Sequence, residues 1–261
     1  MNETILRFET KDRVGEITLN HPVKRNALSR QMLEALRARL LSLRTESAVK
    51  VLIISSTGPV FSSGHDLREL ESATAEQAES LFSLCAETME LLQQIPQPVI
   101  ASVGGLATAA GCQLAASCDL IVASDTAAFA TPGVKIGVFC STPAVAVCRT
   151  LPTKKTLEML FTGQALSAVD AERFGMVNRV VPADRLHEET WTLALQIAGA
   201  AASTLALGKR AYYEQLPLSR SAAYQRASRC MVENVQLPDA REGIAAFLSK
   251  RPPVWKEDSG Q

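Results

Sequence analysis

Two glycine-containing segments decide the fold of this chain: FSSGHDL (residues 61–67) and GGLATAAGCQ (residues 104–113). The first follows the apolar run 51–54 and the second follows the apolar run 98–103, as turns after buried strands would. Glycine and other small residues let a ligand approach the main chain closely in such turns. The pair therefore predicts two strand-to-helix turns, each of which directs a backbone N–H group into one pocket.

The size and charge of the chain fit a globular protein with one main domain. A chain of this length buries roughly 70 to 75% of the surface that its unfolded form exposes. Hydrophobic residues make up 47% of the 261 residues, and 27 basic side chains balance 27 acidic ones, so the composition does not attract nucleic acid by charge. The six cysteines lack the close pairs and histidine partners of a zinc site. We therefore expect reduced thiols, no metal and no nucleic-acid partner.

The start of the chain and its apolar runs bear on location. Residues 1–4 carry an early acid and form no apolar or arginine-rich leader. No apolar run approaches the roughly 20 residues that a membrane span requires. We therefore expect a cytoplasmic protein that does not associate with a membrane.

Apolar spacing predicts stacked β/α units in the first half of the chain. After Ser29, which suits a helix N-cap, apolar side chains recur every three or four residues up to Leu43 and indicate an amphipathic helix. Strands are expected at residues 17–19, 51–55, 99–103 and 120–122, a long helix at 74–94 and a short one after Ala110. Repetition of this unit predicts a spiral of parallel strands.

Beyond residue 150 strand signals become rare and helical stretches follow one another. Helices are expected at residues 154–161, 168–174, 188–202, 206–214, 222–232 and 241–250. Pro217 and Pro238 stand where helices should stop. We therefore divide the chain into a β/α core that carries the site, residues 1–200, and a helical C-terminal region, residues 201–261.

Over residues 14–255 the chain resembles the crotonase superfamily, also called the enoyl-CoA hydratase/isomerase family. The two glycine-containing segments, residues 139–143 and the ending FLSKRPPVW (residues 247–255) carry the similarity. They are most similar to a subgroup called enoyl-CoA hydratase domain-containing proteins. The resemblance implies an α/β fold with a crotonase-like β/α spiral core and a helical C-terminal trimerisation region, and hence a homotrimer or a dimer of trimers.

The same resemblance implies the chemistry of the pocket. Family members stabilise the enolate oxygen of an acyl-CoA thioester with two backbone amides, which here would be the N–H groups of His65 and Ala110. Fixed amide dipoles stabilise this charge without reorganising, and removal of one donor typically costs about 100- to 1000-fold in rate. Because only main-chain donors are needed, the side chains at both positions can vary.

A second set of residues is implied to contact coenzyme A, which would be part of the substrate and not a permanently bound cofactor. Residues 21–28 resemble the first coenzyme A loop of the family, where Lys24 and Arg25 would meet phosphates. The other residues implied to border the coenzyme are Ala27, Ser63, Gly64, Asp66 and Leu67. The alternative for the basic pair is a solvated surface charge.

The two catalytic glutamates of hydratases have no counterpart in this chain. Gln113 stands at the first glutamate position and Gly133 at the second. An amide does not titrate near neutral pH and glycine has no side chain, so the paired acid and base that activate water are lost. We therefore expect weak hydration of crotonyl-CoA. If the pocket is otherwise intact, we expect Gln113→Glu combined with Gly133→Glu to create hydratase activity. Gln113 either orients a water or acyl group or satisfies the start of its helix.

Three other side chains are candidates for chemistry. The imidazole of His65 either transfers protons or points to solvent beside the two amides. Asp66 is expected to cap the helix that follows it. Cys140 is implied to face the acyl chain, and a reactive thiolate there needs a nearby cation such as Lys135 or a helix start; an inert buried cysteine is the alternative.

Two functions from different classes remain open at this point. The first is an acyl-CoA enzyme that uses enolate chemistry, such as isomerisation, decarboxylation or thioester cleavage. The second is a non-catalytic acyl-CoA-binding or regulatory protein. A peptidase on a related fold needs a serine nucleophile and a histidine base, and none of the three histidines can be assigned that role.

Overall fold

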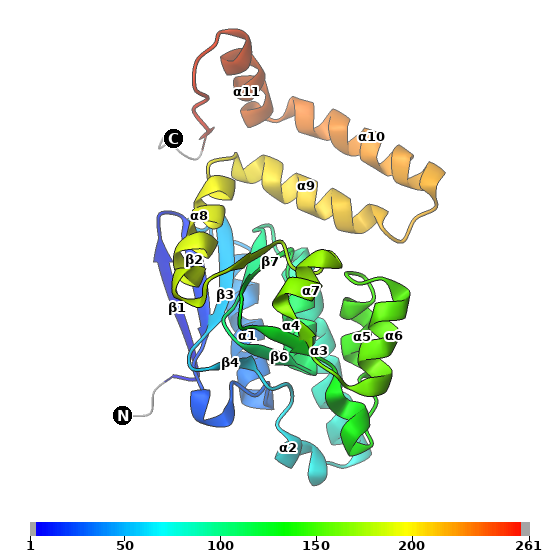
Figure 1. The fold of residues 1–261 in the computed structure, drawn as a ribbon. Coiled ribbons are helices and arrows are strands. Elements are labelled where there is room, and N and C mark those ends of the chain that lie inside the picture. The colour runs from blue at the N-terminus through cyan, green and yellow to red at the C-terminus, as the bar shows by residue number, and fades with distance from the viewer. Residues whose placement is uncertain (1–3, 257–261) are drawn as a thin grey trace.

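The computed structural model describes residues 4–256, in which a core of two sheets and their helices lies below an arm of helices (Figure 1). Residues 1–3, on which the expectation of no leader partly rests, and residues 257–261 of the C-terminal region lie outside the described residues. The larger sheet has the strand order β1 (Leu6–Lys11), β2 (Val14–Leu19), β3 (Val51–Ser56), β5 (Val99–Val103), β7 (Leu120–Ser124) and β10 (Arg179–Val181). Its first pair is antiparallel and all other pairs are parallel.

The smaller sheet is built from short strands that follow the longer ones along the chain. Its order is β4 (Val60–Ser62), β6 (Leu106–Thr108), β8 (Ala128–Ala130) and β9 (Leu166–Ser167). Three times in succession the chain adds one strand to the larger sheet and the next to the smaller one, parallel to the previous turn. This arrangement is the predicted β/α spiral, and it brings the ends of β4, β6 and β8 to one edge.

Helices cover the two sheets and their buried faces follow the sequence pattern. These are η1 (Pro22–Lys24), α1 (Arg30–Leu43), α2 (Leu67–Glu71), α3 (Ala75–Gln94), α4 (Ala110–Ser117), η2 (Pro132–Ile136), α5 (Ser141–Val147), α6 (Thr153–Thr162), α7 (Ala168–Arg173), η3 (Ala183–Arg185) and α8 (Leu186–Ala198). Ser29 caps α1 by accepting from the backbone N–H of Met32. The buried face of α1 consists of Met32, Leu33, Leu36, Leu40 and Leu43. The Thr74 and Gln77 pair forms a capping box at the start of α3.

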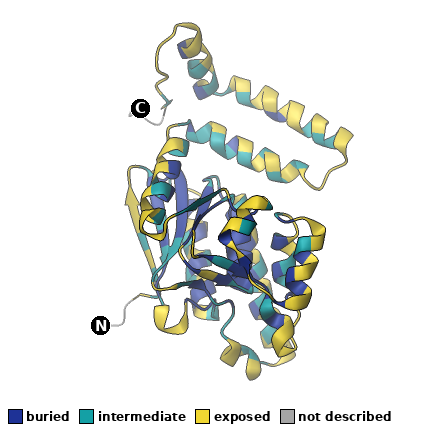
Figure 2. Cartoon of the chain, in the orientation of Figure 1, coloured by how far each residue is buried: buried dark blue, intermediate teal, exposed yellow. Residues whose placement is uncertain are grey.

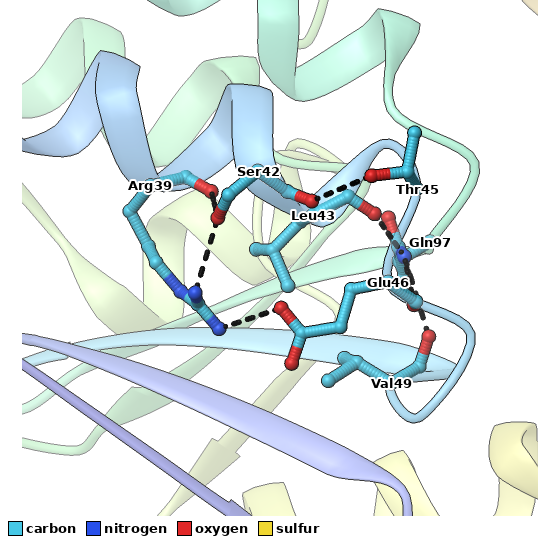
Figure 3. A network of polar contacts seen from close by, with 7 residues as sticks. All are labelled: Arg39, Ser42, Leu43, Thr45, Glu46, Val49 and Gln97. Carbon is cyan, nitrogen blue, oxygen red and sulfur yellow. Dashed lines mark hydrogen bonds and ion pairs between the residues drawn. The ribbon is translucent and has the colours of Figure 1, made fainter.

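The connection from α1 to β3 is closed by Gln97, a buried side chain in the segment before β5. Its Nε2 atom donates to the carbonyl oxygens of Leu43 at 2.8 Å and Val49 at 3.3 Å (Figure 3). The Arg39 guanidinium bonds to Glu46 on the same connection at 2.9 Å. These bonds satisfy carbonyls at the end of α1 and fix where the chain enters β3.

The C-terminal arm consists of α9 (Ala202–Gln215), α10 (Arg220–Gln236) and α11 (Pro238–Leu248), which lie above the core and are largely exposed (Figures 1 and 2). Residues 188–202 do not form the single helix that we expected, because α8 ends at Ala198 and the chain bends by 101° before α9. In the described part of the chain, no single helix is both long and apolar enough to cross a membrane. The segment of η3 and α8 together with α9 is long and apolar enough only when the two are counted as one pair, and this pair is bent.

A buried ion pair attaches the arm to the core. The Lys209 ammonium on α9 lies 2.7 Å from the Asp119 carboxylate and also donates to the carbonyl oxygens of Leu92 and Gln97. The Tyr213 hydroxyl donates to the other carboxylate oxygen of Asp119 at 2.7 Å. Because the Lys209 side chain is only 6% exposed, this cluster satisfies charges that are removed from water.

Candidate active site

A cavity of about 610 Å³ opens where the short strands β4, β6 and β8 end. The residues that line it come from the turns after β4 and β6, from the adjoining ends of β6 and α4, from η2 and the segment between it and α5, and from α2, α3 and α5. They are Ser63, His65, Leu67, Leu70, Phe82, Thr108, Ala109, Ala110, Pro132, Gly133, Lys135, Ile136, Val138, Phe139, Cys140, Ser141, Thr142 and Pro143. None of these side chains is acidic, and most are apolar, so the cavity suits an acyl group.

The two glycine-containing turns touch each other at the wall of this cavity. A Cβ atom on Gly64, which has φ +83°, would lie 3.0 Å from the backbone nitrogen of Ala110. A Cβ atom on Gly111 would lie 2.3 Å from the carbonyl oxygen of Ser62. Both positions therefore require glycine for the turns to meet.

The backbone N–H groups of His65 and Ala110 lie on the turns that line the cavity. Within residues 4–256, neither N–H group donates a hydrogen bond. Ala110 begins α4, whose first N–H groups have no partner inside the helix and carry its positive dipole end. Ala109 precedes it at φ +52°, a strained value for alanine, and donates to the carbonyl oxygen of Ala130 at 2.9 Å. Such unpartnered donors suit a ligand that brings an oxygen.

The predicted coenzyme A loop is bonded directly to the first of these turns. The N–H of Leu28 donates to Gly64 at 2.7 Å, and the N–H of Ser63 donates to Arg25 at 3.0 Å. Asn26, fully buried, donates through Nδ2 to the carbonyl oxygens of Thr57 and Val60, both at 2.8 Å. The predicted coenzyme A loop and the first glycine-containing turn are therefore held together by hydrogen bonds as one unit.

An ion pair also joins the coenzyme A loop to the turn. The Lys24 ammonium lies 2.9 Å from the Asp66 carboxylate, which caps α2 as expected by accepting from the N–H of Arg68. These two bonds lower the pKa of Asp66. The Asp66 carboxylate thus neutralises part of the Lys24 charge within the chain. Of the residues predicted to contact coenzyme A, Ser63 and Leu67 line the cavity, whereas Lys24, Arg25, Ala27, Gly64 and Asp66 do not.

The structure separates the two positions that correspond to the hydratase glutamates. Gly133 lines the cavity, but a Cβ atom there would lie 2.2 Å from the carbonyl oxygen of Val138 and 2.8 Å from the Cys140 sulfur. Gln113, 5% exposed on α4, lines a second cavity of about 220 Å³ instead. This geometry argues against our expectation that glutamates at both positions create a hydratase, because main chain occupies the space at residue 133.

The imidazole of His65 is held inside the wall of the cavity and does not point to solvent. Its Nδ1 atom lies 3.2 Å from the carbonyl oxygen of Leu28, and its ring packs edge-on against Phe82. A carbonyl oxygen only accepts hydrogen bonds, so Nδ1 of the neutral imidazole carries the proton and Nε2 is unprotonated. The Nε2 atom is closed off from solvent and has no hydrogen-bond partner among the described residues. Burial lowers the pKa of this imidazole.

The Cys140 thiol stands at the N-cap of α5 and lines the cavity. Burial raises the pKa of this thiol, while the N–H of Gly133 acts in the opposite direction. A thiol with a raised pKa is protonated near neutral pH, and a protonated thiol is a poor nucleophile. The geometry thus favours the inert cysteine among the two alternatives.

Sequence reasoning missed several residues that the structure brings to the cavity. Thr108 ends β6 just before the second turn, and its Oγ1 atom is enclosed without a partner in the described part of the chain. Its place immediately before that turn is the signal that would have identified it. Phe82 comes from α3, and no local motif marks it. Phe139 precedes α5 and belongs to the stretch 139–143 that carries the family similarity, although its side chain was not singled out.

Comparisons with known proteins match this fold. The enoyl-CoA hydratase/isomerase family model matches residues 9–258. The mitochondrial enoyl-CoA hydratase domain-containing protein 3 of Rattus norvegicus is 52% identical over 94% of this chain and 82% of its own length. The human protein of that name is 48% identical in its crystal structure, with TM-score 0.92 over 97% of this chain and all of that one. The structure of an enoyl-CoA hydratase from Mycobacterium smegmatis is 41% identical, with TM-score 0.95, over 97% of this chain and 99% of that one.

The chain belongs to the enoyl-CoA hydratase/isomerase family, the crotonase superfamily, whose members bind acyl-CoA thioesters. Within the superfamily it falls in the subgroup of enoyl-CoA hydratase domain-containing proteins. The family and its relatives suggest hydratase or isomerase chemistry.

The names of the relatives correct one expectation. The rat, mouse, zebrafish and human proteins are all named mitochondrial. This finding contradicts the cytoplasmic location that we expected from the first residues and the apolar runs of the chain.

Proposed function

We propose that this protein binds acyl-CoA thioesters and stabilises the enolate form of the thioester between the backbone N–H groups of His65 and Ala110. The observation that carries the proposal is that both N–H groups lack a partner in the described chain and belong to residues that line one cavity. Two amide donors in a largely apolar cavity stabilise a negative oxygen strongly, because little water competes with them.

The reaction that follows enolate formation differs from efficient hydration. Hydration needs a base to activate water and an acid to protonate the α-carbon. Gln113 and Gly133 supply neither, and no acidic side chain lines the cavity in the described residues. Isomerisation and thioester cleavage need one base, to take a proton from the substrate or from water, instead of a paired acid and base, and no residue is assigned this role. Decarboxylation needs no base, because the enolate forms as CO2 leaves. We therefore propose weak hydration of crotonyl-CoA.

A panel of acyl-CoA thioesters tests this function. We expect several thioesters to raise the melting temperature, mass spectrometry to detect a product from at least one, and crotonyl-CoA to be hydrated slowly. Efficient hydration of crotonyl-CoA would contradict the proposed loss of the paired glutamates. Failure of every thioester to bind would contradict the site itself.

The second candidate function is non-catalytic binding of acyl-CoA. Two observations favour it: the Nε2 atom of His65 is closed off from solvent, and burial raises the pKa of the Cys140 thiol, which stays protonated near neutral pH. The same panel separates the two functions. Stabilisation without product from any thioester supports binding, and product from any of them supports the enzyme.

We further propose that the arm forms the contacts of a homotrimer or a dimer of trimers. Large apolar side chains stand exposed on it, among them Tyr224 at 71%, Phe247 at 83% and Leu248 at 75%. Exposed apolar side chains that gather on one part of a surface are typical of subunit contacts. Light scattering on the purified protein should give three or six times the chain mass, and a monomer would contradict the proposal.

A further inference from the structure

The cavity at the N–H groups of His65 and Ala110 opens on one side onto an apolar surface. Ile136, Val138 and Phe139 line the cavity, yet they are 60%, 51% and 47% exposed. A side chain that lines a cavity and also meets solvent stands at its mouth, so the rim on this side is apolar. Removal of such side chains from water by an apolar ligand is favourable.

The apolar surface continues from this rim onto α6. The ring centroids of Phe139 and Phe161 lie 6.2 Å apart, a distance at which aromatic rings pack against each other. Phe161 is 62% exposed and lies outside the cavity. The end of α6 packs on the cavity wall, because a Cβ atom on Gly163 would lie 3.0 Å from the Cα atom of Pro132. We call the exposed apolar side chains from the mouth of the cavity to this helix the rim stripe; they are Ile136, Val138, Phe139 and Phe161.

The rim stripe and the coenzyme side of the cavity belong to different walls. Ser63 and Leu67 line the cavity from the first turn and α2, and the N–H of Ser63 is bonded to the predicted coenzyme A loop. The rim stripe comes from η2, the segment before α5, and α6; α2 lies at the bottom of the core and α6 at its right side (Figure 1). The acyl chain leaves the thioester carbon on the side opposite to the sulfur. A coenzyme that lies along the first wall therefore directs the acyl chain toward the rim stripe.

The dimensions of the cavity and the rim stripe indicate the length of the chain. An extended chain advances about 1.3 Å per bond, because the three bonds between successive Cα atoms span about 3.8 Å. A cavity of about 610 Å³ is about 8 Å across if its three dimensions are equal, and Phe161 lies 6.2 Å beyond Phe139. An acyl group of four carbons thus ends inside the cavity, whereas one of twelve carbons, about 14 Å long, reaches Phe161.

We propose that the rim stripe binds the distal half of long, unsubstituted acyl chains, so that the protein prefers long-chain acyl-CoA thioesters to short-chain ones. The inference rests on the proposed function, since the thioester must bind at the N–H groups of His65 and Ala110. Phe161 is then a specificity-determining residue that contacts the end of the chain and takes no part in the reaction.

Titration calorimetry on the full chain with butanoyl-CoA and dodecanoyl-CoA tests the inference. A fully buried CH₂ group raises affinity about fourfold, and the open rim stripe covers each group only in part. We therefore expect dodecanoyl-CoA to bind at least about tenfold more tightly than butanoyl-CoA. Phe161→Ser should weaken dodecanoyl-CoA about three- to tenfold and butanoyl-CoA less than about twofold. Leu195→Ser, which removes an exposed apolar side chain of α8, should change neither affinity.

The outcomes separate the rim stripe from the site itself. In folded Phe161→Ser, an unchanged affinity for dodecanoyl-CoA, or an equal loss for both thioesters, would overturn the inference, while binding of butanoyl-CoA to the wild-type protein keeps the proposed function. Failure of both thioesters to bind the wild-type protein would overturn both.

Two further measurements address other occupants of the rim stripe. Dodecanedioyl-CoA should bind more weakly than dodecanoyl-CoA, because its terminal carboxylate loses water on an apolar surface. Tighter binding of dodecanedioyl-CoA would assign recognition of the chain end to the ammonium of Lys135, which also lines the cavity, and would overturn the inference. Light scattering on Phe161→Ser should give the same mass as the wild-type protein. A smaller assembly with unchanged affinity for dodecanoyl-CoA would assign the rim stripe to a second copy of the chain instead.

Discussion

A Cβ atom on Gly133 would lie 2.2 Å from the carbonyl oxygen of Val138. Real Cβ atoms do not approach a backbone oxygen this closely, so the main chain after η2 would have to move for any side chain to stand at residue 133. Val138 in turn donates its N–H to Gly133 at 2.9 Å, which fixes this loop against the cavity. The position that we matched to the second hydratase glutamate is thus closed by the backbone itself.

The first prediction follows from this closure. Gln113→Glu combined with Gly133→Glu should produce no gain in hydration of crotonyl-CoA, measured by loss of absorbance of the enoyl thioester. Gly133→Ala alone should lower the free energy of unfolding by about 1 to 3 kcal/mol, the usual cost of overpacking. Gly208→Ala is the matched control, because a Cβ atom there meets nothing within 4 Å. A large gain of hydratase activity in the double variant would contradict the observed loop.

A second prediction concerns the coenzyme A loop. Asn26→Ala removes bonds to the carbonyl oxygens of Thr57 and Val60 and to the N–H of His21. Buried groups left without partners cost about 1 to 3 kcal/mol, so unfolding in urea should show a loss of this size. Calorimetry should also show weaker binding of coenzyme A. Val23→Ala on the same loop changes an exposed side chain and should leave both quantities nearly unchanged.

The arm gives a third prediction. Lys209→Met leaves the Asp119 carboxylate, whose side chain is 16% exposed, without its cation and should lower the free energy of unfolding by up to about 3 to 5 kcal/mol. Arg210→Met breaks only an exposed pair with Glu233 and should cost less than about 1 kcal/mol. Chemical denaturation of the two variants measures the difference. Equal losses would mean that the buried cluster does not hold the arm.

The fourth prediction concerns pH. Burial keeps the pKa of His65 below its ordinary value of 6.5, so the unfolded chain binds more protons than the folded one as pH falls through that value. The stability of the wild-type protein should therefore decrease on acidification below pH 6.5. His65→Gln removes this contribution while it keeps the backbone N–H. Melting curves of the wild-type protein and of His65→Gln between neutral and mildly acid pH measure this contribution. Identical pH dependence of the two melting temperatures would contradict the claim that the His65 ring is buried and neutral.

The sequence predicts the longer elements well because their burial is periodic. The apolar spacing after Ser29 matches α1, and residues 99–103 match β5. The strands β4, β6, β8 and β9 have only two or three residues each, too few for a period to appear. They nevertheless position the cavity, so local pattern alone does not reveal its walls.

The candidate site, like the fold, could be predicted from the sequence only in part. The glycine-containing turns can be recognised in the sequence, because the close approach of main chains at Gly64 and Gly111 excludes residues with a side chain. The direction of Gln113 depends on how α4 packs between α3 and α5, and the closure at Gly133 depends on a carbonyl five residues later. Such tertiary contacts have no local signature.

The central claim is that the N–H groups of His65 and Ala110 bind a thioester oxygen. Infrared difference spectroscopy of an acyl-CoA labelled with ¹³C at the thioester carbonyl tests it without requiring turnover. Two donors should polarise the carbonyl and move its stretching band to lower wavenumber on binding than in water. A band that stays at its position in water while the thioester is bound would contradict the account.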